Sequence, residues 1–247
     1  MDRLVYVAMS GAKETLRAQT SNSYNLANVS TVGFRADLSA FQAQQVQGAG
    51  LPSRAYATNS TVGWDASSGT MEQTGRNLDV AVQGQGWIAV QGPDGSEAYT
   101  RAGDLRVDPN GQLTTAAGYP VLSDSGPVSI PPYASISVGS DGSIAIVPLG
   151  QTPQTIAICG RIKLVNPPSA SLERTAGGLY RTQNGGDSPA DASVQLTPGA
   201  LESSNVNMAS AMTNMIELAR TYDMQLKSIK AAEDNDTSST KLLQTNS

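Results

Sequence analysis

The sequence predicts an α+β protein in which an antiparallel, all-β central domain is inserted between N- and C-terminal amphipathic helices. Apolar residues recur at helical spacing near both ends of the chain, and short strand-like runs separated by turn residues fill the middle. The 247 residues are 39% hydrophobic and only 15% charged, so neutral polar residues are abundant. Such a composition favours strands, tight turns and extended contact surfaces over one large apolar core.

Residues 1 to about 30 are predicted to form the first helix. On a helical wheel, one face gathers within about 40° of Val5. This face consists of Met9, Ala12, Leu16, Ser23 and Ala27. Gly33 is well placed to end the helix in a left-handed cap, after which Phe34 could fold back as an apolar contact.

The following residues, 36–67, show no sustained periodicity and are rich in Gln, Ser, Thr and Gly. We interpret them as an extended connector. The next segment, 68–200, is predicted to be the β-rich outer domain, because strand-like runs alternate there with turn sequences. Three of these turns are Pro93-Asp94-Gly95, Asp108-Pro109-Asn110-Gly111 and Ser140-Asp141-Gly142, in which glycine supplies positive φ.

Residues 205 to about 235 return to a helical pattern. Its apolar positions follow one another at alternating spacings of four and three, which is typical of a coiled-coil seam. They are Met208, Met212, Met215, Ala219, Tyr222, Leu226 and Ile229. Asn205 is expected to act as the N-cap. The predicted domains are therefore a discontinuous helical core, 1–35 with 201–247, the connector 36–67 and the outer domain 68–200.

The seam leaves two arrangements open. The C-terminal helix could pack on its own β-domain, or it could need a partner along most of its length. An isolated helix of this kind is marginally stable in water. The free-energy cost of ordering its backbone exceeds the free energy gained by burying one narrow apolar stripe. We expect the terminal helices to pair as a coiled coil and to fold on assembly.

The composition excludes several kinds of chemistry. Histidine is absent, which removes His-based catalytic triads and His-ligated metal sites. The single cysteine, Cys159, lies in a strand-like run and is interpreted as a small core residue. A formal charge of −5 without a basic stripe argues against nucleic-acid binding, and no apolar run is long enough to span a membrane.

The motif-like patterns in the sequence do not support an enzymatic function. Gly84-Gln85-Gly86 precedes a strand instead of opening a helix, so it does not fit a dinucleotide fingerprint. Carboxylates such as Asp79 and Asp104 are expected to be turn or hydrogen-bonding groups. A carboxylate-based hydrolase remains formally open, but the sequence predicts no catalytic residue, no cofactor and no metal.

Three segments together resemble the flagellar axial-protein family, whose members build the basal-body rod and the hook. The segments are Asn25 to Phe34, Leu78 to Trp87 with Tyr99 to Gly103, and Leu201 to Asn207. They occur in this order across nearly the whole chain. The start Met1 to Ala12 and the presence of Trp87 most resemble a proximal-rod member of the family.

The resemblance implies a structural rod subunit in the periplasm that leaves the cytoplasm by the flagellar type III export apparatus, without direct membrane insertion. Its implied partners are copies of itself and other proximal and distal rod proteins. An alternative is a secreted surface β-domain that binds a ligand on a helical stalk. The expected assembly interface comprises Leu4, Val5, Ala8, Met9, Ala12, Leu16, Leu26, Asn28, Gly33, Phe34, Asn205, Val206, Met208, Met212, Met215, Ala219, Tyr222, Leu226 and Ile229.

Overall fold

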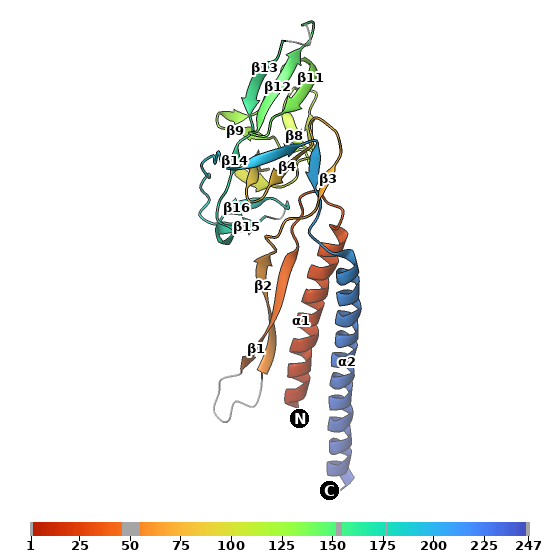
Figure 1. Cartoon of the computed structure of the whole chain (residues 1–247). Coiled ribbons are helices and arrows are strands. Elements are labelled where there is room, and N and C mark those ends of the chain that lie inside the picture. Colours follow the sequence, from red (N-terminus) through yellow and green to blue (C-terminus); the bar gives the residue numbers. More distant parts are fainter. Residues whose placement is uncertain (1, 46–54, 152–154, 176, 246–247) are drawn as a thin grey trace. The chain divides into compact units, whose positions relative to one another are not determined.

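The computed structural model describes residues 2–45, 55–151, 155–175 and 177–245, without the side chains of residues 2–4, 41–45, 55–62, 239 and 242–245 (Figure 1). It divides the chain into two compact units. Unit 1 contains residues 1–29, 36–65 and 206–247, and unit 2 contains residues 30–35 and 66–205. The predicted α+β class is confirmed, since the described residues contain two α-helices and otherwise mainly antiparallel strands.

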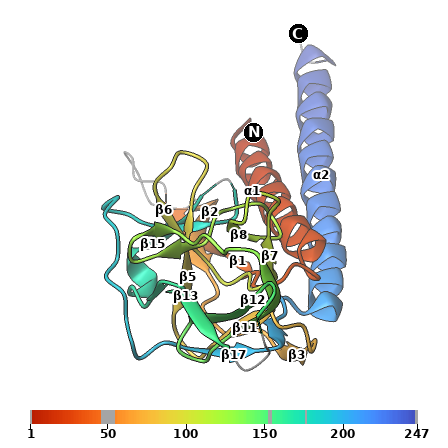
Figure 2. The ribbon, with the colours of Figure 1, turned by 90° about the horizontal axis from the view of Figure 1, so that it is seen from above.

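Unit 1 is built from helix α1 (Asp2–Ala27), helix α2 (Met208–Thr245) and the hairpin of strands β1 (Asp37–Gln45) and β2 (Ala55–Trp64). The two helices lie side by side and run in opposite directions (Figures 1 and 2). Gly11 lies against Gln225, and the amide of Asn22 donates to the Ala211 carbonyl at 2.7 Å. α2 is longer than the sequence predicts, about 57 Å at 1.5 Å per residue.

Small residues of α1 form the face that packs inside unit 1. Ala8, Ala12, Thr15 and Ala18 are buried, and Gly11 lies between them with no side chain of its own. Among the described side chains of α1, Glu14 is the one long side chain buried beside them, and it pairs with Arg17 at 3.0 Å. At Gly11 no side chain separates the two helices. The larger apolar residues Met9 and Leu16 are 54% and 44% exposed.

Two expectations about helix ends were wrong. α1 ends at Ala27, so Gly33 does not cap it, although Gly33 does have a positive φ of 67°. α2 is capped by Asn207 instead of Asn205, because the Asn207 side-chain oxygen accepts from the Ser210 amide at 3.0 Å. Asn205 instead donates to the Ser67 carbonyl at 3.0 Å.

The segment expected to be an extended connector differs in the structure. β1 and β2 within it pair antiparallel from Asp37 opposite Trp64 to Gln45 opposite Ala55. The hairpin belongs to unit 1, where both strands contact α1. These polar strands are held by pairing of their backbones and by contact with a helix. Because such strands need no regular alternation of apolar residues, the sequence did not reveal them.

Unit 2 consists of short strands. They are β3 (Met71–Gln73), β4 (Val80–Gln83), β5 (Trp87–Gln91), β6 (Glu97–Thr100), β7 (Leu105–Val107), β8 (Leu113–Thr115), β9 (Leu122–Ser123), β10 (Gly126–Pro127), β11 (Tyr133–Val138), β12 (Ser143–Pro148), β13 (Ala157–Arg161), β14 (Leu164–Val165), β15 (Leu172–Arg174), β16 (Tyr180–Thr182), β17 (Gln195–Pro198) and β18 (Ala200–Glu202).

The strands of unit 2 form several small sheets instead of one continuous one. The largest has the order β14-β5-β6-β16-β15, and another has the order β11-β12-β13. Their inward side chains share one apolar core, in which Val80, Ile88, Leu105, Leu113 and Ile144 are fully buried. Cys159 packs partly against this core, and burial raises the pKa of its thiol, which supports the structural interpretation.

The predicted turns of unit 2 are confirmed. Gly95, Gly111 and Gly142 each have a φ between 82° and 84°, and each amide closes its turn on a carbonyl three residues earlier. The carboxylate of Asp141 accepts from the hydroxyl and the amide of Ser143. Among the described residues, no helix has the length and hydropathy that crossing a membrane requires.

Candidate functional site

A buried ion cluster around Glu202 ties together distant parts of unit 2. The Glu202 carboxylate lies 2.7 Å from the Arg35 guanidinium and accepts from that of Arg101 at 2.9 Å. It also accepts from the Gly69 amide at 2.9 Å. The side chains of Arg35, Arg101 and Glu202 are only 1%, 4% and 1% exposed. One carboxylate thus joins four segments that are far apart in the sequence.

Aromatic rings and backbone carbonyls complete the surroundings of the cluster. Arg101 donates to the Gly84 carbonyl at 2.7 Å and lies 5.3 Å from the ring centre of Trp87. Trp87 in turn packs on Tyr180 at 4.6 Å between ring centres. Arg35 donates to the Ser67 carbonyl. These contacts offset part of the cost of removing three charges from water.

Residues 31–35 pass through this site as a strap. The Gly33 amide donates to the Glu202 backbone carbonyl at 2.8 Å, and the Phe34 ring lies 4.4 Å from the Arg174 guanidinium. The positive φ of Gly33 disfavours any other residue. A side chain at this position would also collide with the backbone of Arg101 and Ala102.

The electrostatics of the cluster suit a static role. Burial lowers the pKa of Arg35 and the nearby charge of Arg101 lowers it further, whereas Glu202 raises it. Two guanidiniums hold the carboxylate in place, and neither can serve as a proton donor near neutral pH. The arrangement therefore fixes the chain path and offers no acid–base chemistry.

The three sequence segments that suggested a family meet at this cluster. Gly33 and Phe34 come from the first, Trp87 and Arg101 from the second, and Glu202 from the third. Sequence reasoning did not assign Arg35, Arg101 or Glu202 to a site. The cluster could have been suspected from the sequence only because Arg101 and Glu202 lie inside two of the segments that suggested the family.

The helices of unit 1 carry a second candidate feature, an apolar surface that the chain itself leaves uncovered. Apart from Thr221, the buried and half-buried positions described in α2 follow each other at spacings of four and three. They are Ala211, Met215, Leu218, Tyr222, Gln225, Ile229 and Ala232. This observed seam shares Met215, Tyr222 and Ile229 with the predicted one. The remaining predicted positions lie beside it and are exposed.

Comparison with known proteins supports the family. Residues 81–146 match the flagellar hook protein FlgE/F/G D1 domain, and residues 197–242 match the flagellar basal body rod FlgEFG protein C-terminal domain. The chain is 44% identical to flagellar basal-body rod protein FlgF of Escherichia coli (strain K12), over 98% of this chain and 99% of the relative.

It is also 41% identical to flagellar basal-body rod protein FlgF of Salmonella typhimurium, over 98% of this chain and 99% of the relative. A third relative, flagellar basal-body rod protein FlgG of Buchnera aphidicola, is 34% identical over 90% of this chain and 94% of that protein. The chain belongs to the flagellar basal-body rod protein family. It is a structural subunit of the basal-body rod, which spans the periplasm and is built with other axial proteins.

The rod protein places its predicted interface residues in three settings. Ala8, Ala12, Gly33 and Phe34 are buried within the chain. Those partly exposed are Val5, Leu26, Asn28, Asn205, Val206, Met215, Tyr222 and Ile229. Those well exposed are Met9, Leu16, Met208, Met212, Ala219 and Leu226. Leu4 lies in α1, but its side chain is outside the described residues.

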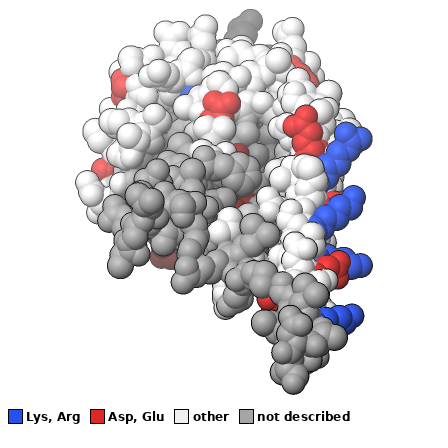
Figure 3. All heavy atoms as spheres, turned by 90° about the horizontal axis from the view of Figure 1, so that it is seen from below, with Lys and Arg blue, Asp and Glu red and all other residues white. Residues whose placement is uncertain are grey.

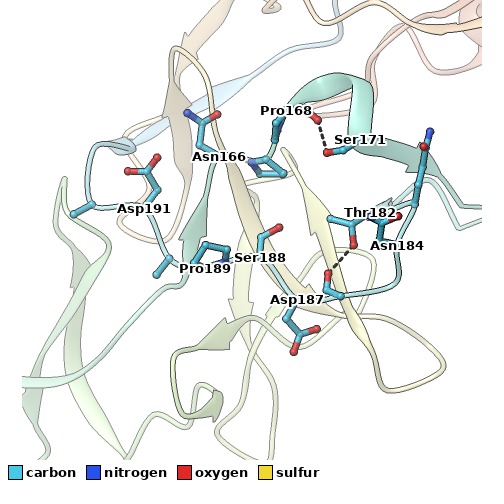
Figure 4. Close-up of a pocket in the computed structure, with 14 residues that line it drawn as sticks. Asn166, Pro168, Ser171, Thr182, Asn184, Asp187, Ser188, Pro189 and Asp191 are labelled. Carbon is cyan, nitrogen blue, oxygen red and sulfur yellow. Dashed lines mark hydrogen bonds between the residues drawn. The ribbon is translucent and has the colours of Figure 1, made fainter.

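The rod protein also has an open pocket of about 560 Å³ in unit 2, lined mainly by residues 166–171 and 182–192 (Figure 4). Its polar groups largely serve the loop itself. The Thr182 hydroxyl donates to the Gly186 carbonyl at 2.6 Å, and the Ser171 hydroxyl to that of Pro168 at 2.7 Å. Asp187 and Asp191 lie on different sides of the pocket (Figure 4). In the described part of the chain, no three potential ligands gather to hold a metal.

Asp79 is a hydrogen-bonding group, as expected, and Asp104 lies opposite it in the backbone. Their backbones form an isolated β-bridge, and the Asp79 carboxylate accepts from the Thr74 hydroxyl at 2.7 Å. Burial raises the pKa of Asp104, and the charge of Asp79 adds to this effect. Hydrogen bonds from the Ser143 hydroxyl and amide lower the pKa of Asp141.

Glu202→Gln should strongly destabilise unit 2. The amide keeps the shape of the side chain but leaves two buried guanidiniums without a full negative partner, at a cost of about 3–5 kcal/mol. Denaturant unfolding of the full chain, followed by the fluorescence of buried Trp87, measures this loss. Asp94→Asn is the matched control, because it removes a surface ion pair with Arg181 that water screens. Equal losses for the two variants would contradict the assigned role of Glu202.

Asp104→Asn and Asp141→Asn should change stability in opposite directions. The raised pKa of Asp104 means that its charge favours the unfolded state once the pH exceeds about 3.9. Asp104→Asn should therefore raise the free energy of unfolding at neutral pH and have no such effect near pH 3. The lowered pKa of Asp141 gives the opposite sign: Asp141→Asn should lose stability at neutral pH, and this loss should shrink as the pH falls. Urea unfolding at both pH values checks the pair, and changes of the same sign at neutral pH would contradict the assignment.

Proposed function

We propose that this rod protein assembles through the outer faces of α1 and α2, which pair as coiled coils with the helices of neighbouring rod subunits. The observation that carries the proposal is the exposure of large apolar side chains on both helices. Met9 and Leu16 on α1 and Met212, Ile216 and Leu226 on α2 are between 43% and 55% exposed. Each such side chain contributes about 1.5–3 kcal/mol when fully buried.

The positions of these residues on the helices support the same proposal. In α1 they lie on the side of the helix away from Gly11, which lies against Gln225 of α2. In α2 the exposed positions Met212, Ala219 and Leu226 repeat every seven residues beside the observed seam. A helix with two adjacent seams can contact two partners at once, which suits a tube of several helices.

Charge on α2 lies away from the seam. Arg220, Lys227, Lys230 and Lys241 are exposed, and Figure 3 shows basic side chains along one edge of this helix. These cations lie off the inner seam that packs within the chain, so they do not oppose that packing. They also keep the free helix soluble.

In this proposal the chain is a proximal-rod subunit with a purely structural role and no catalytic activity or cofactor. Its partners are copies of itself and the proximal and distal rod proteins. The relatives of highest identity named above are both called FlgF, which supports a place in the same part of the rod. We further propose that the chain leaves the cytoplasm unfolded through the flagellar type III export apparatus and folds its helices on assembly.

Leu226→Asp should block rod assembly and abolish motility while leaving unit 2 folded. Leu226 is 43% exposed, so the substitution costs little within one chain, but it would place a carboxylate in the proposed apolar contact. Swimming of a strain that carries the variant gene in place of the natural one measures assembly. Circular dichroism and thermal unfolding of the purified variant check the fold.

Ser228→Asp is the matched control, because it adds the same charge at an exposed position of α2 outside both seams. It should leave motility close to that of the unaltered protein. A motile Leu226→Asp strain with normal rods would refute the proposed contact.

A further inference from the structure

The three-stranded sheet β11-β12-β13 carries the most exposed apolar side chains of the described residues. Ile158 in β13 is 74% exposed, and Leu149 and Ile156 beside the sheet are each 68% exposed. The opposite face of the sheet is packed into the core by Ile136, Val138, Ile144 and Ile146. Contiguous exposed apolar surface of this kind marks a contact site in soluble proteins.

Both edges of this sheet are open. The order β11-β12-β13 makes β11 and β13 the edge strands, and in the described part of unit 2 no further strand pairs with either of them. Their unpaired backbone amides and carbonyls can accept another strand. Proteins usually protect such edges with lysines, prolines or inward-pointing charges.

That protection is missing here. Tyr133–Val138 contains no charge and no proline, and β13 has only Arg161 at its last position. The Arg161 guanidinium is turned back to donate to the Asp141 carbonyl at 2.7 Å. Between Asp124 and Arg161 the only charged residue is Asp141. In a chain of net charge −5, this stretch is where a second copy can approach with least repulsion.

The direction of the strands identifies the geometry of such a contact. β11 and β13 both pair antiparallel with β12, so they run the same way. The β13 edge of one copy can therefore pair in parallel with the β11 edge of a copy that has the same polarity. This contact joins two different surfaces, so it can repeat from copy to copy instead of closing a two-fold dimer.

We propose that β13 of one copy docks on β11 of a neighbouring copy, which continues the sheet through Ile158 and the surrounding apolar surface. The inference rests on the proposed function for its context. The exposed patch is on the order of a few hundred Å², less than the roughly 800 Å² per partner of a stable complex. The contact is thus weak alone and forms when the helices of unit 1 hold copies at high effective concentration.

The test uses paired cysteines in assembled rods. In a Cys159→Ser background, Ile158→Cys and Ser137→Cys are introduced into the same chain, and basal bodies purified from motile cells are treated with a mild oxidant. The two positions lie on the same row of the sheet, each opposite Ala145. Within one chain they are two strand spacings apart, about 9–10 Å, which is too far for an internal disulfide.

A ladder of disulfide-linked dimers, trimers and longer species, about tenfold or more above either single-cysteine variant, supports the proposal. Assembled basal bodies without a ladder overturn it. Dimers from Ile158→Cys alone overturn it as well, because they indicate a symmetrical β13–β13 contact. A disulfide to a different protein would show that the β11 or β13 edge contacts another partner, and it would overturn the proposal too.

Two further variants keep the test decisive if the paired cysteines fail to assemble. Ile158→Lys should impair motility, whereas Met71→Lys, an exposed apolar residue of unit 2 outside this sheet, should not. Equal motility of both strains overturns the proposal. Adding Leu226→Asp separates it from the helix contact. When whole cells carrying that variant are oxidised, a ladder that persists refutes the helix contact alone. The strand contact itself is judged by the ladder in motile cells.

Discussion

The carboxylate of Glu202, held between the buried guanidiniums of Arg35 and Arg101, is the interaction on which the rest of unit 2 depends. Unit 2 is discontinuous, since residues 30–35 precede the hairpin of unit 1 and residues 66–205 follow it. Burying three charges is costly, and the cost is tolerated only because each group finds partners. The cluster therefore favours one path for the strap, residues 31–35, because an alternative path would leave a buried charge without its partner.

The same constraint accounts for residues in each of the three sequence segments that suggested the family. Gly33 is needed where the strap passes the backbone of Arg101, and its amide bonds to the residue that anchors the cluster. Trp87 covers the Arg101 guanidinium from one side. These residues are far apart in the sequence, yet each serves the same buried group. A structural requirement thus accounts for a pattern that could otherwise suggest a ligand site.

Unit 1 differs from unit 2, because its helices bury little apolar surface within the chain and leave several large apolar side chains exposed. The residues of α1 that contact α2 include Gly11 and Asn22, which contribute little apolar area to that contact. The large apolar residues remain outside, which is unfavourable for a monomer and useful for a subunit that must bind neighbours. The two units therefore divide the work: unit 2 is stabilised internally, and unit 1 provides surface for assembly.

Sequence reasoning succeeded where structure follows from local rules. The turns at Gly95, Gly111 and Gly142 were predictable because each needs positive φ, and both helices were predictable from apolar spacing. The N-cap was misplaced by two residues because Asn205 and Asn207 are chemically alike, and only geometry distinguishes them.

Other features depend on tertiary context that no local pattern contains. The apolar spacing of α2 predicted one seam, which includes Met212, Ala219 and Leu226, as part of the assembly interface. Within the chain Ala211, Leu218 and Gln225 are more buried, and Gln225 lies against Gly11 of α1. The role of Glu202 was not foreseen, because its partners are more than 100 residues away. The β1–β2 hairpin lacked the apolar alternation that usually reveals a strand.

Amide hydrogen exchange of the purified monomer distinguishes a self-stabilised unit 2 from helices that need partners. We predict slow exchange through unit 2, including the Gly33 amide that donates to Glu202, and fast exchange through α1 and α2, whose apolar faces lack their assembly partners. Protection of both helices equal to that of unit 2, or a Gly33 amide that exchanges as fast as the helices, would contradict it.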